Sequence, residues 1–169
     1  AVTADKTRFA YATRLNGFKA DAAKVWPGRN RITSLDLSYQ GLVSFPASLC
    51  ALTGLKKLNI YRNKIAALPD AIGDLKELTV LNVGSNELTA LPNTLGALTE
   101  LTELAAYGNK LTTLPDSIAA LTLMKKLNFC GNTFTTLPKP IVKLTSLTEL
   151  NLYNNQLVTL PDSIAALTA

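Results

Sequence analysis

Few side chains in this 169-residue chain could carry out covalent chemistry. The chain contains two cysteines, Cys50 and Cys130, twelve carboxylates and no histidine. Without histidine, neither a Ser-His-Asp nor a Cys-His nucleophile can be assembled, and no HExxH zinc motif can occur. Two cysteines cannot supply a structural zinc site, and no glycine-rich phosphate-binding motif is present. The sequence therefore predicts no catalytic site, no metal site and no cofactor.

A second group of residues is suited to binding rather than to catalysis. Tyr61, Tyr107 and Tyr153 recur at a constant spacing, and Arg62 follows the first of them. Tyrosine and arginine combine a large contact area with a polar tip and are enriched among the residues that dominate protein interfaces. Amides and charged residues recur in the same register, and we expect them to share a protein-binding surface with the tyrosines: Lys57, Asn59, Asn82, Glu103, Lys126, Asn128, Glu149 and Asn151.

A 23-residue repeat determines where these side chains must lie. Within each repeat, apolar residues recur at positions 1, 4, 6, 11, 14, 18 and 21. Positions 4 and 6 alternate with polar neighbours, and this period of two predicts a short strand with one buried face. Positions 14, 18 and 21 have helical spacing and predict one or two turns of helix or 3₁₀ helix. The six repeats start at Ile32, Leu55, Leu78, Leu101, Met124 and Leu147.

Two further positions hold one residue type almost throughout. Position 9 is asparagine in repeats two to six and Gln40 in the first. We expect this amide to be buried and to bond backbone groups from one repeat to the next. Position 15 is always proline, from Pro46 to Pro161, and we expect it to be the first helical residue, where its missing N–H is not needed.

One repeat cannot bury its own apolar residues, but stacked repeats share a continuous core. Strands about 4.8 Å apart would form a curved parallel sheet on the concave side of an arc, with the short helices on the convex side. Positions 3, 5, 7 and 8 are then expected to point outward from the sheet. These positions hold the binding residues named above, and position 7 also holds Cys130. Cys50 should lie on the convex side, too far away for a disulfide, with both thiols reduced.

The pattern LxxLxLxxNxLxxLPxxIxxL over residues 32–169 resembles the leucine-rich repeat family in its 23-residue form. It is similar to the intracellular Ras-group repeat proteins and to recognition domains of bacterial effectors. The resemblance implies an α/β leucine-rich-repeat solenoid that binds a protein partner on its concave sheet and is not itself an enzyme. The alternative is the substrate-targeting half of a larger enzyme, such as a bacterial effector ubiquitin ligase, with the catalytic domain outside this chain.

The segments at the two ends carry separate predictions. Residues 1–31 do not follow the repeat, and Tyr11, Leu15, Phe18 and Val25 have the spacing of one face of an amphipathic helix. We expect a helical cap over the first repeat, with a docking helix as the alternative. The sixth repeat is not modified toward a polar cap, which predicts one of two outcomes: the natural protein continues with more repeats or another domain, or two chains associate end to end through this C-terminal repeat.

The net charge of +5 is concentrated in residues 1–31, which carry seven basic and two acidic groups. Residues 32–169 carry ten of each, so no net field would steer nucleic acid to the repeats. No apolar run approaches the roughly 18 residues of a membrane span. We therefore expect neither a nucleic-acid nor a membrane partner. The small number of cysteines and the absence of Asn-x-Ser/Thr favour a cytoplasmic location.

Overall fold

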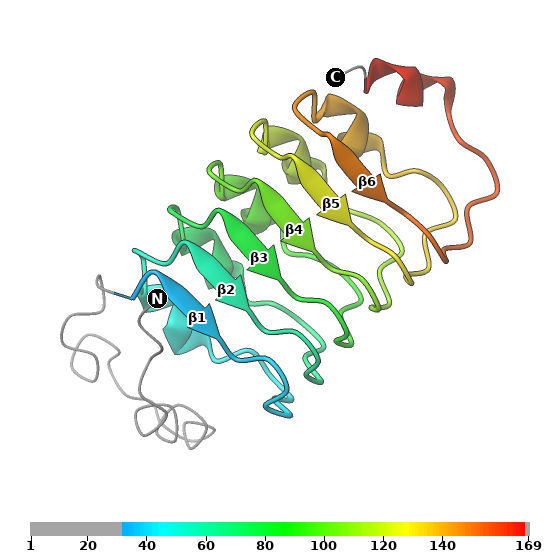
Figure 1. Cartoon of the computed structure of the whole chain (residues 1–169). Helices are drawn as coiled ribbons and strands as arrows, with labels where there is room; N and C mark the ends of the chain where they lie inside the picture. The colour runs from blue at the N-terminus through cyan, green and yellow to red at the C-terminus, as the bar shows by residue number, and fades with distance from the viewer. Residues whose placement is uncertain (1–31, 168–169) are drawn as a thin grey trace.

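In a computed structural model, the chain is described over residues 32–167 as a stack of six coils, one for each repeat (Figure 1). Each coil contributes one strand to a six-stranded sheet whose order follows the chain. The strands are β1 (Ser34–Asp36), β2 (Lys57–Asn59), β3 (Val80–Asn82), β4 (Glu103–Ala105), β5 (Lys126–Asn128) and β6 (Glu149–Asn151). The return segments contain the 3₁₀ helices η2 (Ala47–Ala51), η3 (Asp70–Asp74), η4 (Asn93–Ala97), η5 (Asp116–Ala120), η6 (Lys139–Lys143) and η7 (Asp162–Ala166).

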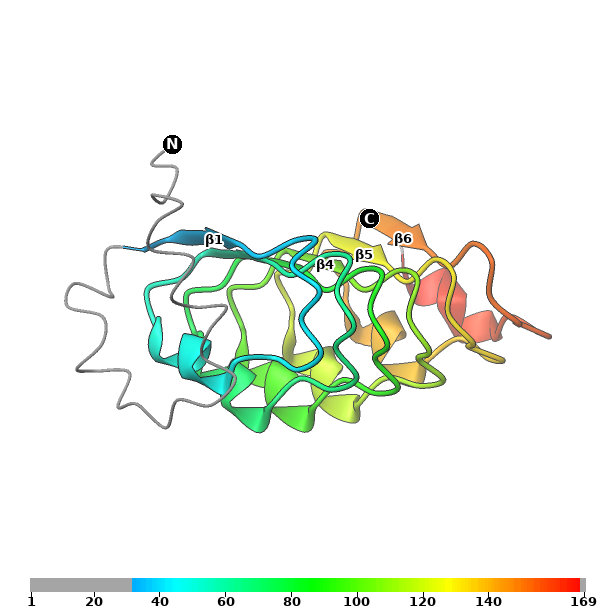
Figure 2. The same cartoon turned by 90° about the horizontal axis from the view of Figure 1, so that it is seen from below.

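The strands form one layer and the 3₁₀ helices form the opposite layer (Figure 2). All strand pairs are parallel, and each residue lies beside the residue of the same repeat position in the next coil, as Leu58 does beside Leu81. Equal repeat lengths produce this register, because a slip of one residue would turn the buried side chains outward. The predicted leucine-rich-repeat solenoid, with strands and 3₁₀ turns alternating, is confirmed.

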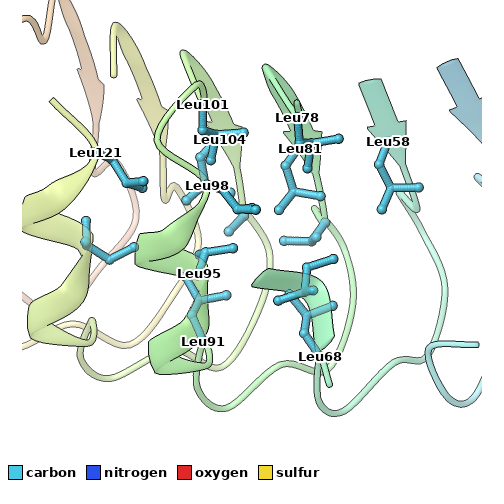
Figure 3. Close-up of a cluster of buried hydrophobic side chains, with 14 of the residues drawn as sticks. Leu58, Leu68, Leu78, Leu81, Leu91, Leu95, Leu98, Leu101, Leu104 and Leu121 are labelled. Atoms are coloured by element: carbon cyan, nitrogen blue, oxygen red, sulfur yellow. The ribbon is translucent and has the colours of Figure 1, made fainter. Parts of the chain in front are cut away.

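The core lies between the two layers (Figure 3). Leu81 of β3 is fully buried, and so are Leu88 and Leu95 from the return segment of the same coil. Each fully buried leucine stabilises the fold by roughly 1.5–3 kcal/mol. In the central coils, every apolar position of the repeat is buried, as the spacing predicted.

The asparagines at position 9 form a buried hydrogen-bond ladder beside the core. The Nδ2 group of Asn86 donates to the carbonyl of Ile60 in the preceding coil and to that of Val83 in its own coil. Its Oδ1 accepts the N–H of Ile65. Asn63, Asn109 and Asn132 repeat this geometry. These bonds satisfy backbone groups that the turn leaves unpaired, so the prediction of a relay between coils is confirmed.

The expectation for proline at position 15 was wrong by one residue. Pro69, Pro92 and Pro115 precede the first 3₁₀ residue and have extended backbone torsion angles, with ψ of 153°, 149° and 144°. The carbonyl of Pro69 accepts the first turn's hydrogen bond from Ile72. Proline is tolerated there because the N–H of a capping residue takes no part in the helical hydrogen bonds.

Three sequence predictions concern the ends of the chain or a membrane. The helical cap of residues 1–31 lies outside the described residues. In the sixth coil, Leu150 and Leu152 are only partly buried, and Val158 and Leu160 are exposed. Self-association through this coil stays a prediction. Between residues 32 and 167, no helix has the length and apolar character of a membrane span.

Candidate binding surface

The outward side of the sheet, which we call the sheet face, consists of positions 3 and 5 of the six strands. Leu58, Leu104 and Leu127 at position 4 point into the core, while both of their neighbours in each strand are exposed or half-buried. This alternation places eight of the twelve predicted binding residues on one continuous face: Lys57, Asn59, Asn82, Glu103, Lys126, Asn128, Glu149 and Asn151.

An open hollow of about 620 Å³ lies in the sheet face over β3 to β6. Its lining includes the small residue Ala105 between Asn82 and Asn128, and Val80 at its β3 end. The amides and charged groups around Ala105 and Val80 give the hollow a mixed polar and apolar surface. A hollow of this size can accept side chains of a partner, and it contains six of the predicted binding residues: Asn82, Glu103, Lys126, Asn128, Glu149 and Asn151.

Three charged residues cross the hollow in a row at position 3. The Lys126 Nζ atom lies 2.6 Å from the Glu149 Oε1 atom, and Glu103 lies beside Lys126 in β4. The hydrogen bond to Glu149, followed by the charges of both glutamates, raises the pKa of Lys126. Because these side chains are exposed, their pairing adds little to stability. Its effect is to present a fixed negative–positive–negative pattern on the sheet face.

Three tyrosines and one arginine form a contact cluster just after the strands, which we call the tyrosine cluster: Tyr39, Tyr61, Arg62 and Tyr107. The Tyr39 and Tyr61 rings meet edge to face with centroids 5.3 Å apart. The Tyr61 and Tyr107 centroids are 5.7 Å apart. The Arg62 guanidinium carbon lies 5.1 Å from the centroid of the Tyr39 ring. Such aromatic and cation–π contacts hold the side chains in place.

The cluster changes the acidity of its phenols in opposite directions. Hydrogen bonding with Tyr39, then with Ser85, and the charge of Arg62 lower the pKa of Tyr61. Burial and the neighbouring Tyr61 raise the pKa of Tyr107. The hydroxyl of Tyr61 is therefore a stronger acid than that of Tyr107.

Gly84 makes the contact between Tyr61 and Tyr107 possible. These tyrosines belong to coils two and four, whose strands should lie roughly 10 Å apart. The Tyr107 ring leans across the intervening Gly84, and a Cβ atom added to this glycine would lie 2.7 Å from the ring. Any larger residue at this position would push the ring aside. The sequence signal for this contact was a glycine at position 7 of coil three, followed by a tyrosine at position 7 of coil four.

Position 8 differs from the sequence expectation. It was expected to be an outward strand residue, but each strand ends at position 5 and position 8 is a left-handed turn residue. The φ angles are 59° for Tyr39 and 54° for Arg62, while coils four and five have Gly108 and Gly131 there. The chain adopts this conformation because it must turn from the strand toward the buried asparagine at position 9. Arg62 therefore extends from a turn beside the sheet face.

The asparagines at position 5 have a structural role that the sequence did not predict. The Asn59 Oδ1 atom accepts the backbone N–H of Tyr61 at 3.1 Å, and Asn82 accepts that of Gly84 at 3.0 Å. Asn128 and Asn151 do the same for Cys130 and Tyr153. Their carbonyl oxygens are therefore occupied, and each of these side chains offers its NH₂ group to a partner. This surface consequently presents more hydrogen-bond donors than its composition suggests.

Tyr153 does not join the other tyrosines. It is 77% exposed in coil six, and the preceding coil has Cys130 at this position instead of an aromatic residue. Cys130 is half-buried after β5, whereas Cys50 is buried in η2 on the opposite layer, and both thiols are free. Burial, together with the charge of Asp74, raises the pKa of Cys50 to about 11. Within residues 32–167, no group of three or more metal-ligating side chains occurs.

Two sequence patterns match the chain. The pattern of a leucine-rich repeat region matches residues 35–132, and that of a single leucine-rich repeat matches residues 146–167. Among curated proteins, no sequence matches the chain significantly.

Solved structures with similar folds come from bacteria and plants. An internalin (inlF) from Listeria monocytogenes is 27% identical over 82% of this chain, with a TM-score of 0.74. A leucine-rich-repeat protein of Leptospira interrogans is 32% identical over 89%, with a TM-score of 0.62. The ectodomain of the Arabidopsis thaliana receptor kinase GASSHO1/SCHENGEN3, solved in complex with CASPARIAN STRIP INTEGRITY FACTOR 2, is 30% identical over 73%, with a TM-score of 0.65. The chain spans 39%, 50% and 16% of these three chains, respectively.

Proposed function

Because this chain belongs to the leucine-rich repeat family, whose domains generally mediate protein–protein interactions, we propose that it binds a protein partner on its sheet face. The observation that carries the proposal is the tyrosine cluster, in which Tyr39, Tyr61, Arg62 and Tyr107 touch beside an open hollow. Preordered aromatic side chains lose little conformational entropy on binding, so they favour affinity.

The backbone at position 8 supports the same conclusion. A left-handed conformation costs a residue with a side chain roughly 1–2 kcal/mol, and glycine avoids most of this strain. Coils four and five have glycine at position 8, but coils one and two have Tyr39 and Arg62. Large side chains kept in a strained conformation next to one another are typical of functional sites.

The hollow adds polar and charged side chains next to the tyrosine cluster. Its charge row and its NH₂ groups favour a partner that brings hydrogen-bond acceptors and at least one basic group for Glu103. Fully exposed charges contribute mainly to specificity and to the rate of association, whereas the aromatic residues contribute most of the affinity. The predicted residues Lys57, Asn59 and Tyr153 would form the rim of this interface.

A display library of random peptides, selected on the immobilised chain, would test the proposal. Replacing Tyr61 and Tyr107 with alanine should weaken binding of the selected peptides by roughly a hundredfold, because interface tyrosines contribute about 2 kcal/mol or more. Gly84→Ala should weaken binding without removing any tyrosine, since its Cβ atom displaces the Tyr107 ring.

Asp116→Ala, on an exposed residue of η5 in the opposite layer, is the matched control and should leave binding unchanged. Circular dichroism should be the same for all variants. If the double tyrosine variant binds the peptides as well as the original chain does, the sheet face is not the binding surface.

A further inference from the structure

Ala105 interrupts a row of hydrogen-bond acceptors on the sheet face. In the other five coils, the side chain at position 5 accepts the backbone N–H of position 7, as Asp36 does for Ser38 and Asn82 for Gly84. Alanine has no acceptor. Between residues 32 and 167, the N–H of Tyr107 donates no hydrogen bond. One main-chain donor is therefore left without a protein partner in coil four.

A second donor adjoins the same place. In coil two, Asn59 lies beside Asp36, its counterpart in the preceding coil, and against the effect of burial the hydrogen bonds of Ser38, followed by the Asn59 amide, lower the pKa of Asp36. Asn128 has the equivalent position next to Ala105, where no acceptor exists. Its Oδ1 atom is used by the N–H of Cys130, so its NH₂ group is the donor that remains.

The position of this gap connects the two parts of the binding surface. Ala105 lines the hollow, and Tyr107, two residues later, belongs to the tyrosine cluster. The Tyr107 ring leans away over Gly84, so the ring does not fill the space that an asparagine would occupy at position 105. A partner that contacts both parts must pass over Ala105.

The geometry points to a specificity-determining position, the Ala105 gap, that binds an uncharged carbonyl oxygen from an extended segment of a protein partner. The oxygen takes the place that the position-5 side-chain oxygen takes in other coils, and it accepts hydrogen bonds from the Tyr107 N–H and the Asn128 Nδ2 group. An uncharged oxygen is favoured over a carboxylate because Glu103 lies on the same strand and the same face, while Lys126 is already paired with Glu149. This inference rests on the proposed function and names the chemical group of the partner that the Ala105 gap selects.

The free protein provides the first test. The temperature coefficients of backbone amide shifts, measured by NMR on ¹⁵N-labelled chain, distinguish an N–H bonded within the protein from one bonded to water. Tyr107 should behave as a water-bonded amide, whereas Tyr61, Gly84 and Cys130 should behave as internally bonded amides. If Tyr107 has the same coefficient as the other three, no free donor exists and the inference is wrong.

The binding test uses Ala105→Asn, which restores the side chain found at position 5 in coils two, three, five and six. The new carboxamide should bond the Tyr107 N–H and raise the melting temperature, so a folding failure is not expected. It should also fill the gap and weaken binding of the library-selected peptides by at least about tenfold, because the partner's oxygen loses both of its hydrogen bonds. Ala120→Asn makes the same change on an exposed residue of η5 and should leave affinity unchanged.

The outcomes separate this inference from the proposed function. If the peptides bind Ala105→Asn and the original chain equally, while the Tyr61 and Tyr107 substitutions abolish binding, the gap is unused and the sheet-face function stands. If no peptide binds either protein, the proposed function and the inference both fail. If the peptides bind through a carboxylate, so that exchanging their Asp or Glu for the amide abolishes binding, the assignment of an uncharged oxygen is overturned.

Discussion

At the scale of single residues, the backbone of position 8 is strained where the tyrosine cluster forms. Tyr39, Arg62 and Ser85 have positive φ angles, whereas Gly108 and Gly131 take the same conformation without a Cβ atom. The side chains in the first two coils also form the tyrosine cluster. The solenoid therefore tolerates local backbone strain at two residues of the tyrosine cluster, Tyr39 and Arg62.

Comparing two substitutions of Arg62 isolates that strain. Arg62→Gly and Arg62→Ala both remove the guanidinium over Tyr39, but only glycine relieves the left-handed conformation. Arg62→Gly should be more stable than Arg62→Ala by about 1 kcal/mol in a denaturant titration, and the two should bind peptides equally weakly. Equal stability of the two variants would contradict the claim of backbone strain.

The two cysteines should differ sharply in reactivity. Cys50 is buried and its pKa is raised to about 11, so almost none of it is thiolate at neutral pH. Cys130 is half-buried on the sheet side. Mass spectrometry after iodoacetamide treatment of the folded chain should find Cys130 modified and Cys50 unmodified. Denatured chain, in which both should react, is the control, and alkylation of Cys50 in the folded chain would show that η2 is less well packed than described.

At the scale of elements, glycines set the spacing of the 3₁₀ layer. A Cβ atom added to Gly96 in η4 would lie 2.3 Å from the Ser117 carbonyl oxygen in η5, and one added to Gly73 would lie 2.7 Å from that of Thr94. The contacted atoms belong to the backbone, so they cannot move aside as a flexible side chain can. Close packing of η3, η4 and η5 therefore depends on these two residues.

Gly96→Ala should consequently destabilise the fold. Forcing η4 and η5 apart should lower the free energy of unfolding by about 1–3 kcal/mol, the usual effect of an overpacked contact. Ala120→Ser, on the exposed side of η5, should change stability by less than about 0.5 kcal/mol. Chemical denaturation of both variants measures the difference, and a fully stable Gly96→Ala chain would mean that the layer has room to expand.

At the scale of the whole molecule, the fold is a repetition of one unit. Every strand pairs with its neighbour at the same repeat positions, and the Asn86 side chain bonds only to its own and the preceding coil. The free energy of unfolding of such a chain is approximately a sum of two terms for each coil. One is the intrinsic stability of the coil, and the other is the stability of its contacts with neighbouring coils. Removing one whole coil should therefore preserve the remaining interfaces.

Deleting residues 101–123, one full repeat, should give a folded chain with a lower melting temperature. Deleting residues 101–122 is the control, because the one extra residue that it leaves behind shifts the downstream strands by one position relative to the asparagine ladder. The second chain should lose cooperative unfolding in a thermal melt followed by circular dichroism. Similar cooperative melts for the two deletions would contradict a strict 23-residue register.

A cytoplasmic location remains an expectation from the cysteines and the missing glycosylation sites. The similar structures include an ectodomain of a plant receptor kinase, so the fold alone does not favour this compartment. Mapping the location of a tagged copy in the cell would test the expectation directly.

The sequence by itself determined the repeat, the core and the asparagine ladder. The spacing of Leu81 and Val83 predicts their burial, because apolar residues with a period of two must turn one face of a strand inward. Asn86 at the end of such a strand must find backbone partners if it is buried, and it does. These features follow from local patterns that are present in each repeat separately.

Only the tertiary structure decided how the candidate binding surface is assembled. The contact of Tyr61 with Tyr107 depends on the absence of a Cβ atom at Gly84, and the free N–H of Tyr107 depends on the absence of an acceptor at Ala105. The left-handed backbone of Arg62 likewise appears only when the turn is built. The period of the sequence shows which residues face the same way. Contacts between coils also depend on backbone torsion angles and on the positions that have a small side chain or none. For that reason the sequence predicted the face, and the structure defined the cluster, the hollow and the gap within it.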